Sequence, residues 1–473
     1  MLVGVPRLLV ASTGSNVGKT SLTCGIIRAF QRRGLSVAAF KNGPDYVDPL
    51  FLERVTGAAG RNLDLFLLGR DGVRASLARN ARGCGIAVIE GAMGYYDGIA
   101  TSDEASSWDL AVATSTPAVL VVDGRGRALS AAAEVRGFLG LRAPSNIAGV
   151  IVNRCSDAFF PRMKQLIEDE CGVAVAGYLP PLEDVGFDSR HLGLVPASEI
   201  AGIDAKIDRL ADAVEAHVDV EGLIALANGA GALDVSGDEL PEGGRVAPGG
   251  STARSDAPRF EGVSIAVASD EAFCFYYADA LFALEQRGCT IRKFSPLSDP
   301  RLPADASGLY LGGGYPELHA ARLEENASMR RSVREAASAG MPVIAECGGF
   351  MYLHEFVEDA QRNRFSGAGV IGGTAFPTGR LGRFGYASLH PHGDSLLFRK
   401  GEVVRAHEFH YWDSDCAGAD LTARKPRSDR SWECGHATPT MYAGFAHVNL
   451  CSDPRLADRF AESCARFSRR IGA

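Results

Sequence analysis

The sequence predicts an α/β protein in which a parallel-sheet domain is followed by a second α/β domain. Over about the first 220 residues, apolar runs alternate with amphipathic segments, the pattern of a parallel sheet with crossover helices. A glycine-rich loop of the phosphate-binding kind follows the first run. After a polar stretch the α/β pattern resumes near Gly262, and 473 residues are enough for two or three domains.

The strands of the first domain are predicted from near-continuous apolar runs, as expected for strands buried on both faces of a sheet. These runs cover residues 7–12, 35–40, 86–90, 117–123, 146–153 and 173–179. Helical segments lie between the runs, for example those that begin at Lys19 and Ala128. The first domain is therefore assigned to residues 1–225.

A change of composition separates the two domains. Residues 229–259 are rich in Gly, Pro, Ser and Asp and have no apolar period, so they read as a flexible linker. We assign the linker to residues 226–259 and the second domain to residues 260–473.

The second domain begins with predicted strands at 262–268, 290–294, 308–313 and 342–346, with a helix over 275–288. The stretches 403–412 and 441–448 are predicted to be antiparallel, and a helix at 453–470 closes the chain.

Charge and cysteine content narrow the function classes. A net charge of −8 argues against a nucleic-acid partner, which would need a basic face. The N-terminus lacks the features of a signal peptide, and no apolar run reaches the ~18 residues of a membrane span. Eleven cysteines without a C-x-x-C pair argue against a disulfide framework or zinc site. The sequence predicts a cytoplasmic protein without a membrane partner.

The segment TGSNVGKT, residues 13–20, nearly fits the phosphate-loop pattern G-x-x-x-x-G-K-[ST], with Thr13 in place of the first glycine. It follows a strand and opens a helix, the context that makes this motif credible. Lys19 is predicted to reach the terminal phosphates of ATP, and the Thr20 hydroxyl to ligate Mg²⁺. The predicted nucleotide-binding residues are Gly14, Ser15, Asn16, Val17, Gly18, Lys19, Thr20 and Ser21.

Two carboxylates are candidates for completing the magnesium site. Glu90 ends one predicted strand, and Asp45 follows another, with Asp48 close behind it. The carboxyl ends of parallel strands meet at the ligand-binding edge of an open α/β sheet. A phosphate-bound Mg²⁺ needs one or two carboxylates. Thr20, Asp45 and Glu90 are therefore the predicted metal ligands, and the alternative is that the carboxylates are solvated loop residues.

The second domain carries a candidate nucleophile. Cys347 ends an apolar strand and is followed by Gly348 and Gly349, small residues that permit the strained turn of a nucleophile elbow. His447 could accept the thiol proton. The predicted oxyanion donors are backbone N–H groups of Gly313, Gly314 and Gly348. The alternatives are a core cysteine and a structural histidine, the role also expected of His407 and His410.

Eight segments together resemble one family. They are GSNVGKT, FKNGPDYVDP, RNLD, EGAMGYYDG, RHLGLVPA, DEAFCFYY, LGGGYPE and AECGGFMYL. This set closely resembles the cobyrinate a,c-diamide synthases, glutamine-dependent amidotransferases of corrinoid biosynthesis. The resemblance implies an N-terminal domain like dethiobiotin synthetase and a C-terminal domain of the class I glutamine amidotransferase type.

The resemblance also implies a reaction and its participants. ATP would activate the a- and c-acetate carboxylates of a corrin-type tetrapyrrole as acyl phosphates, and ammonia from glutamine would displace the phosphate. Cys347 would attack glutamine, with His447 as its activating base. The ATP and substrate cleft would be lined by Asp45, Tyr46, Asp48, Glu90 and Asp97, with Tyr46 and Asp97 counted as catalytic.

One departure from the family concerns the third member of the glutaminase site. The family commonly shows a Tyr-Leu-His-Leu-His type segment, whereas this chain has Phe445-Ala446-His447-Val448-Asn449. The first histidine is kept and the second is Asn449, so the residue that would orient His447 stays open.

Other substrates and classes fit part of the pattern. Hydrogenobyrinate and nickel sirohydrochlorin are amidated by the same chemistry with the same motifs, and cobyric acid synthase shares both domains but lacks GPDYVDP. A phosphate-loop nucleotide switch would carry a lysine where this chain has Gly14, and would not need Cys347. A binding protein with a decayed glutaminase half would not need both Cys347 and His447. The ring metal, the order of amidation and the oligomeric state stay open, with a homodimer as one expectation.

Overall fold

The computed structural model describes residues 1–182, 185, 189–190, 193–194, 200, 202–235 and 259–471. The chain forms two compact units, Met1–Ala253 and Arg254–Ala473. Both are α/β units with a mainly parallel sheet, which confirms the predicted fold class.

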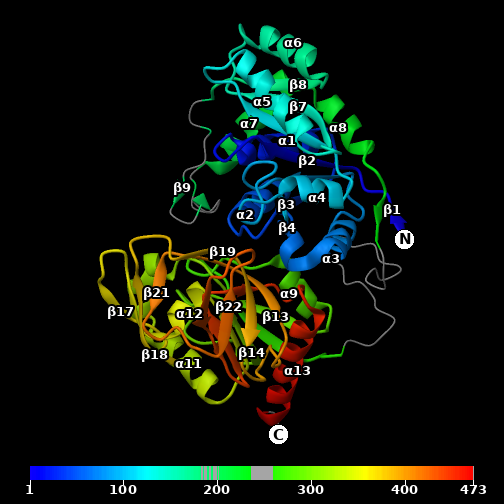
Figure 1. The fold of residues 1–473 in the computed structure, drawn as a ribbon. Helices are drawn as coiled ribbons and strands as arrows, with labels where there is room; N and C mark the ends of the chain where they lie inside the picture. Colours follow the sequence, from blue (N-terminus) through cyan, green and yellow to red (C-terminus); the bar gives the residue numbers. More distant parts are fainter. Residues whose placement is uncertain are drawn as a thin grey trace. The chain divides into compact units, whose positions relative to one another are not determined.

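The first unit is built on a seven-stranded sheet in the order β4-β3-β5-β2-β6-β7-β8, and all its strand pairs are parallel (Figure 1). The strands are β2 Arg7–Ser12, β3 Val37–Asn42, β4 Arg61–Leu63, β5 Ile86–Glu90, β6 Ala118–Asp123, β7 Ile147–Asn153 and β8 Val175–Leu179. β2, β3 and β5 are buried along their whole length, as their apolar runs predict. The short β4 has no apolar run and was not predicted.

Eight helices complete the first unit as described. They are α1 Lys19–Arg32, α2 Asp48–Thr56, α3 Leu65–Asn80, α4 Ser107–Ala113, α5 Leu129–Gly140, α6 Phe160–Cys171, α7 Ile203–His217 and α8 Val220–Asn228. The helix α1 packs on α7, and α5 packs on α6. The helix α1 connects β2 to β3, whereas α5 connects β6 to β7, which lies towards the other edge of the sheet. Because crossovers between parallel strands are right-handed, these two helices lie on opposite faces of the sheet.

The start of the predicted linker is structured. The helix α8 runs to Asn228, and β11 (Leu233–Asp234) pairs antiparallel with β1 (Leu2–Val3). Leu233 is buried, so this pair fixes both segments to the first unit. Residues 226–235 therefore do not form part of a flexible linker. Their strand could not be recognised in the sequence, because two residues are too few to show an apolar period. The remainder of the proposed linker, 236–258, lies outside the described residues. Most of the motif RHLGLVPA, residues 190–197, also lies outside them. The exceptions are Arg190, which ends β9 (Ser189–Arg190), and β10 (Gly193–Leu194).

The second unit contains a six-stranded sheet in the order β13-β12-β14-β15-β25-β24. Its strands are β12 Ser264–Ala268, β13 Thr290–Phe294, β14 Ala306–Leu311, β15 Val343–Glu346, β24 His436–Ala437 and β25 Met441–Gly444. The expectation that residues 441–448 are antiparallel is confirmed for the pairing of β25 with β24, but β25 also pairs parallel with β15, which was not predicted. The parallel pairing brings the ends of β15 and β25 to one edge of the sheet.

Two smaller sheets and six helical segments complete the second unit. A mixed sheet has β16 His354–Glu358, β17 Arg364–Ser366, β18 Ile371–Pro377 and β21 Trp412–Ser414. An antiparallel sheet has β19 Arg383–Pro391, β20 Val404–His410, β22 Leu421–Arg424, β23 Ser431–Cys434 and β26 His447–Val448, which confirms the prediction for 403–412. The helices are α9 Ala278–Glu285, η2 Pro316–His319, α10 Ala320–Glu325, α11 Ala327–Ser338, α12 Gly348–Leu353 and α13 Pro454–Ile471.

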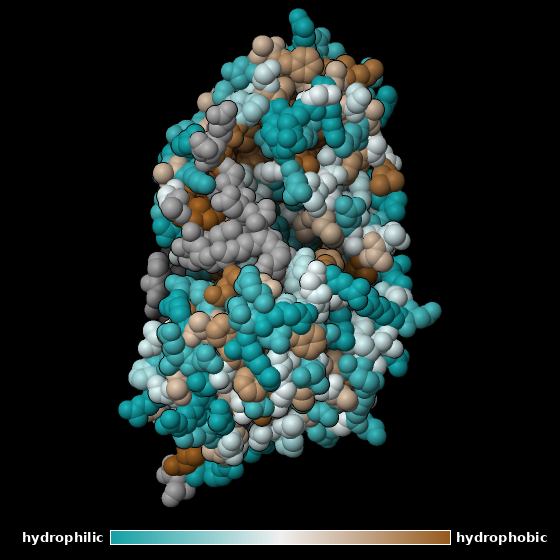
Figure 2. All heavy atoms as spheres, turned by 90° about the vertical axis from the view of Figure 1, so that its left-hand side faces the viewer, coloured by the Kyte–Doolittle hydropathy of each residue, from teal (hydrophilic) through white to brown (hydrophobic). Residues whose placement is uncertain are grey.

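Apolar side chains on the surface are scattered. On the face shown in Figure 2, hydrophobic residues form small separate groups among hydrophilic ones. The exposed large side chains include Leu129 in the first unit and Phe384 in the second. Single exposed apolar residues of this kind are normal for a protein surface. Within the described residues, no helix is both long and apolar enough to cross a membrane.

Candidate active sites

The loop between β2 and α1 has the conformation that phosphate binding requires. Gly18 adopts φ 93°, and a Cβ there would come within 2.5 Å of Asn153 Nδ2. Only glycine fits this position, because the left-handed conformation and the close neighbour both exclude a side chain. Asn153, the last residue of β7, holds the loop by donating from Nδ2 to the Val17 carbonyl at 2.7 Å. This support is not predicted from the sequence, although Asn153 ends a predicted strand.

Lys19 lies across the loop. Its Nζ donates to Ser12 Oγ at 2.9 Å, to the Gly14 carbonyl at 3.1 Å and to the Met93 carbonyl at 2.6 Å. Burial, followed by the charge of Lys41, lowers the pKa of Lys19 to about 8. Its three acceptors are neutral oxygens. A phosphate is a stronger acceptor for the charged amine, so a bound phosphate could replace them.

Thr20 and Glu90, two predicted magnesium ligands, meet at this edge of the sheet. Thr20 Oγ1 donates to Glu90 Oε1 at 2.6 Å. Glu90 is fully buried, and its Oε2 has no hydrogen-bond partner among the described residues. A buried oxygen without a partner is costly unless a ligand completes it. A phosphate-bound Mg²⁺ takes few ligands from the protein and the others from phosphate and water, so Thr20 and Glu90 would suit such an ion.

A lysine that the sequence analysis did not single out completes this cluster. Lys41 Nζ lies 3.0 Å from Glu90 Oε1 and 2.5 Å from Asp48 Oδ2, and the lysine is 3% exposed. Burial alone would lower the pKa of Lys41, but Asp48 and Glu90 outweigh burial and raise it. Burial also raises the pKa of Glu90 to about 7, against the opposing charge of Lys41. The motif FKNGPDYVDP contains Lys41 and Asp48, so the signal was present in the sequence.

Asp45 is placed differently from its predicted role. Its Oδ1 accepts the backbone N–H groups of Val47 and Asp48, at 2.8 and 3.0 Å, and so shapes the turn into α2. Burial and the charge of Asp48 raise the pKa of Asp45 to about 6. No contact joins Asp45 to Thr20 or Glu90 in the described structure, whereas Asp48 reaches the cluster through Lys41. Asp48 is therefore the better placed of the two carboxylates.

Tyr46 and Asp97, the two residues implied as catalytic in this half, lie on neighbouring loops. Tyr46 is half-buried in the turn that Asp45 shapes. Asp97 Oδ2 accepts from the Gly94 N–H at 3.0 Å, and its charge acts on Lys19. The structure thus brings Asp97 to the phosphate loop and Tyr46 to the loop after β3.

In the second unit, Cys347 has the strained backbone of a nucleophile elbow. It adopts φ 49° and ψ −103° between β15 and α12. A Cβ at Gly349 would lie 2.1 Å from the Leu311 carbonyl, and one at Gly348 would lie 2.9 Å from Pro316 Cδ. The two glycines are therefore required by close packing, as the sequence predicts. Strain of this kind in a non-glycine residue is characteristic of functional sites.

The proposed oxyanion donors separate into two groups. The Gly313 N–H already donates to the Phe275 carbonyl at 3.3 Å, so Gly313 does not fit the predicted donor role. Gly314 adopts φ 153°, and a Cβ at Gly348 would lie 3.0 Å from the Gly314 nitrogen. Gly314 thus lies beside Gly348 at the elbow, so the N–H groups of these two residues remain the proposed donors.

His447 lies at the same sheet edge, where a carboxylate contacts its ring. Its Nδ1 is 3.4 Å from Oε2 of Glu346, the residue before Cys347. The Cys347 N–H donates to the Gly444 carbonyl at 2.8 Å, which ties the elbow to the end of β25 just before His447. At the Cε1–Nε2 edge of the ring, a Cβ at Gly313 would come within 2.7 Å of His447 Cε1. The predicted base therefore lies at the same sheet edge as the nucleophile, with its ring in contact with the residue that precedes Cys347.

Buried carboxylates surround the thiol. Burial and then the charge of Glu317 raise the pKa of Cys347 well above its ordinary value, with smaller contributions from Glu408 and Glu346. The free thiol is therefore protonated, and a base must take its proton when the nucleophile is needed.

Neighbouring histidines and Asn449 have other partners. His410 stacks on Phe445 with ring centroids 4.0 Å apart, and its Nε2 lies 3.4 Å from Glu408 Oε2. His407 is the cross-strand neighbour of His447, and burial lowers the pKa of His407 to about 3. Asn449 Oδ1 accepts the Cys451 N–H at 2.9 Å. The Asn449 carboxamide oxygen thus caps a turn after β26.

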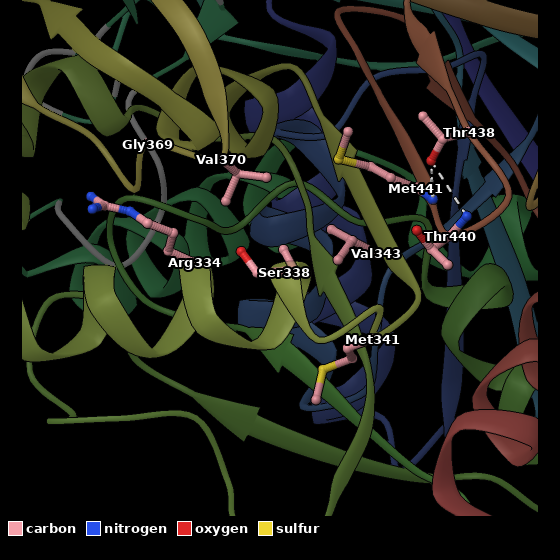
Figure 3. A pocket seen from close by; sticks show the side chains of 10 residues that line it. Arg334, Ser338, Met341, Val343, Gly369, Val370, Thr438, Thr440 and Met441 are labelled. Carbon is pink, nitrogen blue, oxygen red and sulfur yellow. Dashed lines mark hydrogen bonds between the residues drawn. The ribbon is translucent and has the colours of Figure 1, made fainter. Parts of the chain in front are cut away.

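A pocket of about 300 Å³ lies at the opposite end of β15 from Cys347 (Figure 3). Val343 and Met441, the first residues of β15 and β25, line it with Arg334 of α11. Thr438 Oγ1 accepts N–H groups of its own turn, and Arg334 donates to the Ala368 carbonyl. These polar groups stabilise the local structure. Because the pocket lies at the other end of β15, it is separate from the cysteine site.

Comparison with known proteins places this architecture in a family. A family model described as CobQ/CobB/MinD/ParA nucleotide binding domain matches residues 8–194, and one described as CobB/CobQ-like glutamine amidotransferase domain matches residues 264–448. The cobyrinate a,c-diamide synthase of Caldanaerobacter subterraneus is 38% identical over 98% of this chain and 99% of its own length. That of Salmonella typhimurium is 39% identical over 97% of this chain and 98% of its own length. The chain belongs to the cobyrinate a,c-diamide synthase family of ATP-using, glutamine-hydrolysing ligases.

Proposed function

We propose that this enzyme amidates the a- and c-acetate carboxylates of cobyrinate with ammonia from glutamine, using one acyl phosphate intermediate for each amide. The observation that supports this most directly is that one chain contains a phosphate loop with Lys19 lying across it and a strained Cys347 at the same sheet edge as His447. Both relatives named above are called cobyrinate a,c-diamide synthase, and each aligns with this chain over nearly its whole length.

In the first unit, the γ-phosphoryl group of ATP is transferred to a substrate carboxylate. A carboxylate oxygen attacks the γ-phosphorus, the bond to the β-phosphate oxygen breaks, and ADP leaves. Lys19 binds the phosphates, and Thr20 with Glu90 would hold Mg²⁺, which neutralises the charge that develops on the phosphate oxygens. Asp48 and Lys41 set the charge around Glu90.

In the second unit, glutamine gives up its amide nitrogen. His447 takes the proton of Cys347, the sulfur attacks the carboxamide carbon, and the N–H groups of Gly314 and Gly348 stabilise the oxyanion. The C–N bond breaks as ammonia leaves with a proton from His447, and water then hydrolyses the thioester to glutamate. In the first unit ammonia attacks the acyl phosphate, whose C–O bond breaks to release phosphate.

Mass spectrometry with isotopic label tests this proposal. The purified enzyme is incubated with ATP, Mg²⁺ and glutamine labelled with ¹⁵N in its amide, and in parallel with cobyrinate, hydrogenobyrinate or nickel sirohydrochlorin. We expect two labelled amides on cobyrinate. Two amides on another ring only would reassign the substrate, and no amide on any ring would contradict amidation.

The depressed pKa of Lys19 predicts proton uptake when ATP binds. At pH 8.5 a lysine of pKa about 8 is mostly neutral, and a bound phosphate raises the pKa again. Binding of ATP without Mg²⁺ should take up roughly 0.7 proton at pH 8.5, and little at pH 6.5. Calorimetry in buffers of different ionisation enthalpy measures the uptake. Lys19→Arg, which stays charged throughout, should lose most of it; equal uptake in both proteins would contradict this assignment.

Tyr46 is proposed as a contact of the macrocycle. Tyr46→Ala should slow amide formation at least tenfold, a loss of about 1.4 kcal/mol of transition-state stabilisation, while glutamine hydrolysis by Cys347 continues. Amide formation and glutamate release are measured on the same samples. Near-normal amide formation would remove Tyr46 from the proposed substrate site.

We place the enzyme in the cytoplasm without a nucleic-acid or membrane partner, consistent with its net charge of −8. A homodimer is the proposed assembly, and light scattering of the purified chain tests it.

A further inference from the structure

Glu346 is a buried carboxylate that precedes the nucleophile in sequence and contacts the ring of the proposed base. It ends β15, it is 2% exposed, and Cys347 follows it directly. Its Oε1 accepts the Val448 N–H at 2.8 Å. Its Oε2 accepts the Tyr310 hydroxyl at 3.1 Å and lies 3.4 Å from His447 Nδ1. Both carboxylate oxygens are thus directed at groups that can donate hydrogen bonds.

The contact with Glu346 decides which nitrogen of His447 carries the proton. A carboxylate in its ionised form can only accept hydrogen bonds, so this contact favours the tautomer in which Nδ1 carries the proton and the lone pair lies on Nε2. Nε2 belongs to the ring edge that faces Gly313, where a Cβ would come within 3.2 Å of it. Gly313 precedes Gly314, which lies beside Gly348 in the elbow. The basic nitrogen is therefore on the side of the proposed reaction site.

We propose that Glu346 is the positioning residue of the glutaminase site, where it holds His447 in the Nδ1–H tautomer and stabilises the imidazolium formed when Cys347 loses its proton. This inference rests on the proposed glutaminase function of Cys347 and His447. It also supplies the orienting residue that the sequence left open at Asn449, whose carboxamide oxygen caps a local turn. The orienting acid would then precede the nucleophile in sequence by one residue.

The backbone at the elbow makes this adjacency possible. Glu346 ends a regular strand, whereas Cys347 adopts φ 49° and ψ −103°, so the two side chains leave the chain in different directions. The carboxylate remains against β14 and β26 through Tyr310 and Val448. The negative charge of Glu346 also contributes to keeping the thiol protonated, so its benefit must come through His447 and not through direct activation of sulfur.

The proton movement in this arrangement is balanced. The S–H bond of Cys347 breaks and an N–H bond forms at His447 Nε2, which gives a thiolate and an imidazolium beside the Glu346 carboxylate. The same proton is later transferred from Nε2 to the departing ammonia. Glu346 remains ionised throughout and touches neither glutamine nor the thioester, which is why it is a positioning and not a catalytic residue.

Glu346→Gln in the full-length enzyme tests the proposal. The new amide can present its NH₂ group to His447 Nδ1, which forces the proton onto Nε2 and removes the base. We expect kcat for glutamine hydrolysis to fall about 10²–10⁴-fold, the range set by tautomer loss in a hydrolytic triad. KM for glutamine and the ammonia-dependent synthesis rate should stay within about twofold, because neither depends on this proton.

Tyr310→Phe is the matched control. It removes the hydroxyl that donates to Glu346 Oε2 but keeps the carboxylate beside His447, so kcat should fall less than about tenfold, the effect of one lost hydrogen bond. If Glu346→Gln does not fold, Glu346→Asp keeps the charge with a shorter reach and should give an intermediate loss of kcat.

A direct readout of the tautomer comes from NMR of enzyme labelled with ¹⁵N in histidine, with His447 assigned through His447→Gln. Wild type should show the Nδ1–H form, and Glu346→Gln should shift His447 towards Nε2–H. An unchanged tautomer together with a kcat within threefold of wild type would overturn the proposal. A wild-type enzyme that hydrolyses no glutamine would instead contradict the proposed function, and the tautomer would still report on Glu346.

Discussion

Replacing Cys347 with alanine is expected to abolish glutamine-dependent amidation and to leave ammonia-dependent amidation unchanged. The thiol is the proposed nucleophile, and without it no thioester forms, so release of glutamate should fall by at least about 10³-fold. The phosphate loop belongs to the other compact unit and keeps its geometry, so added ammonium salt should restore amide formation. The measurement is mass spectrometry of the macrocycle with either glutamine or ammonium as the nitrogen source.

Cys434→Ala is the control for this change. Cys434 is also buried in the second unit, and burial raises its pKa to about 12, but it lies in a regular strand with no elbow. Its replacement should leave glutamine-dependent amidation within about twofold of wild type, since surrounding apolar groups can tolerate a small cysteine-to-alanine change. Glutamine-dependent amidation that survives in Cys347→Ala would remove the cysteine from the mechanism.

Lys41→Met is expected to destabilise the first unit by about 3–5 kcal/mol, the usual cost of removing one partner from a buried ion pair. The lysine is 3% exposed, and its Nζ contacts Glu90, Asp48 and the Gly91 carbonyl. Methionine fills a similar volume, so the loss would come from two carboxylates left without their cation. Urea denaturation of the full chain, followed by a signal from the first unit, measures the free energy of unfolding.

Two comparisons separate charge from packing in this experiment. In Lys41→Met with Glu90→Gln, part of the lost stability should return, because one unpaired carboxylate has been removed. Arg54→Met breaks the pair with Asp204, in which both side chains are about half exposed, and should change stability by less than about 1 kcal/mol. A loss below 1 kcal/mol for Lys41→Met would show that the buried cluster does not depend on its lysine.

The sequence predicts the central strands of the first sheet well because these strands are buried on both faces. Residues 7–12 and 86–90 form β2 and β5 with the predicted bounds, and both strands are buried throughout. Residues 290–294 also form β13 as predicted, although this edge strand is mostly exposed. The pairing of β1 with β11 could not be predicted, since two-residue strands have no period. The parallel pairing of β25 with β15 was missed because β25 lies between a parallel and an antiparallel neighbour, and its four residues do not show which strands those are.

The candidate sites divide in a similar way. Residues that a motif constrains locally, such as Gly18 and Cys347, are where the sequence places them. The partners that complete each site come from other strands: Lys41 neutralises Glu90, and Glu346 contacts His447. Such pairs depend on which strands are neighbours and on which face each side chain lies. A single sequence shows that Glu346 ends a strand, but not that a histidine 101 positions later contacts it.

The pairing of β15 with β25 has a consequence for how the chain can change length. Glu346 is in register with Gly444, and only two residues separate Gly444 from His447. A deletion there would shift the imidazole by about 3.3 Å, one strand residue, and disconnect it from its carboxylate. The segment between α12 and β25 holds one additional sheet and all strands of the other except β26, but it enters and leaves at fixed points. Insertions in its outer loops should therefore be tolerated, whereas the short segment from Gly444 to His447 should admit no change in length.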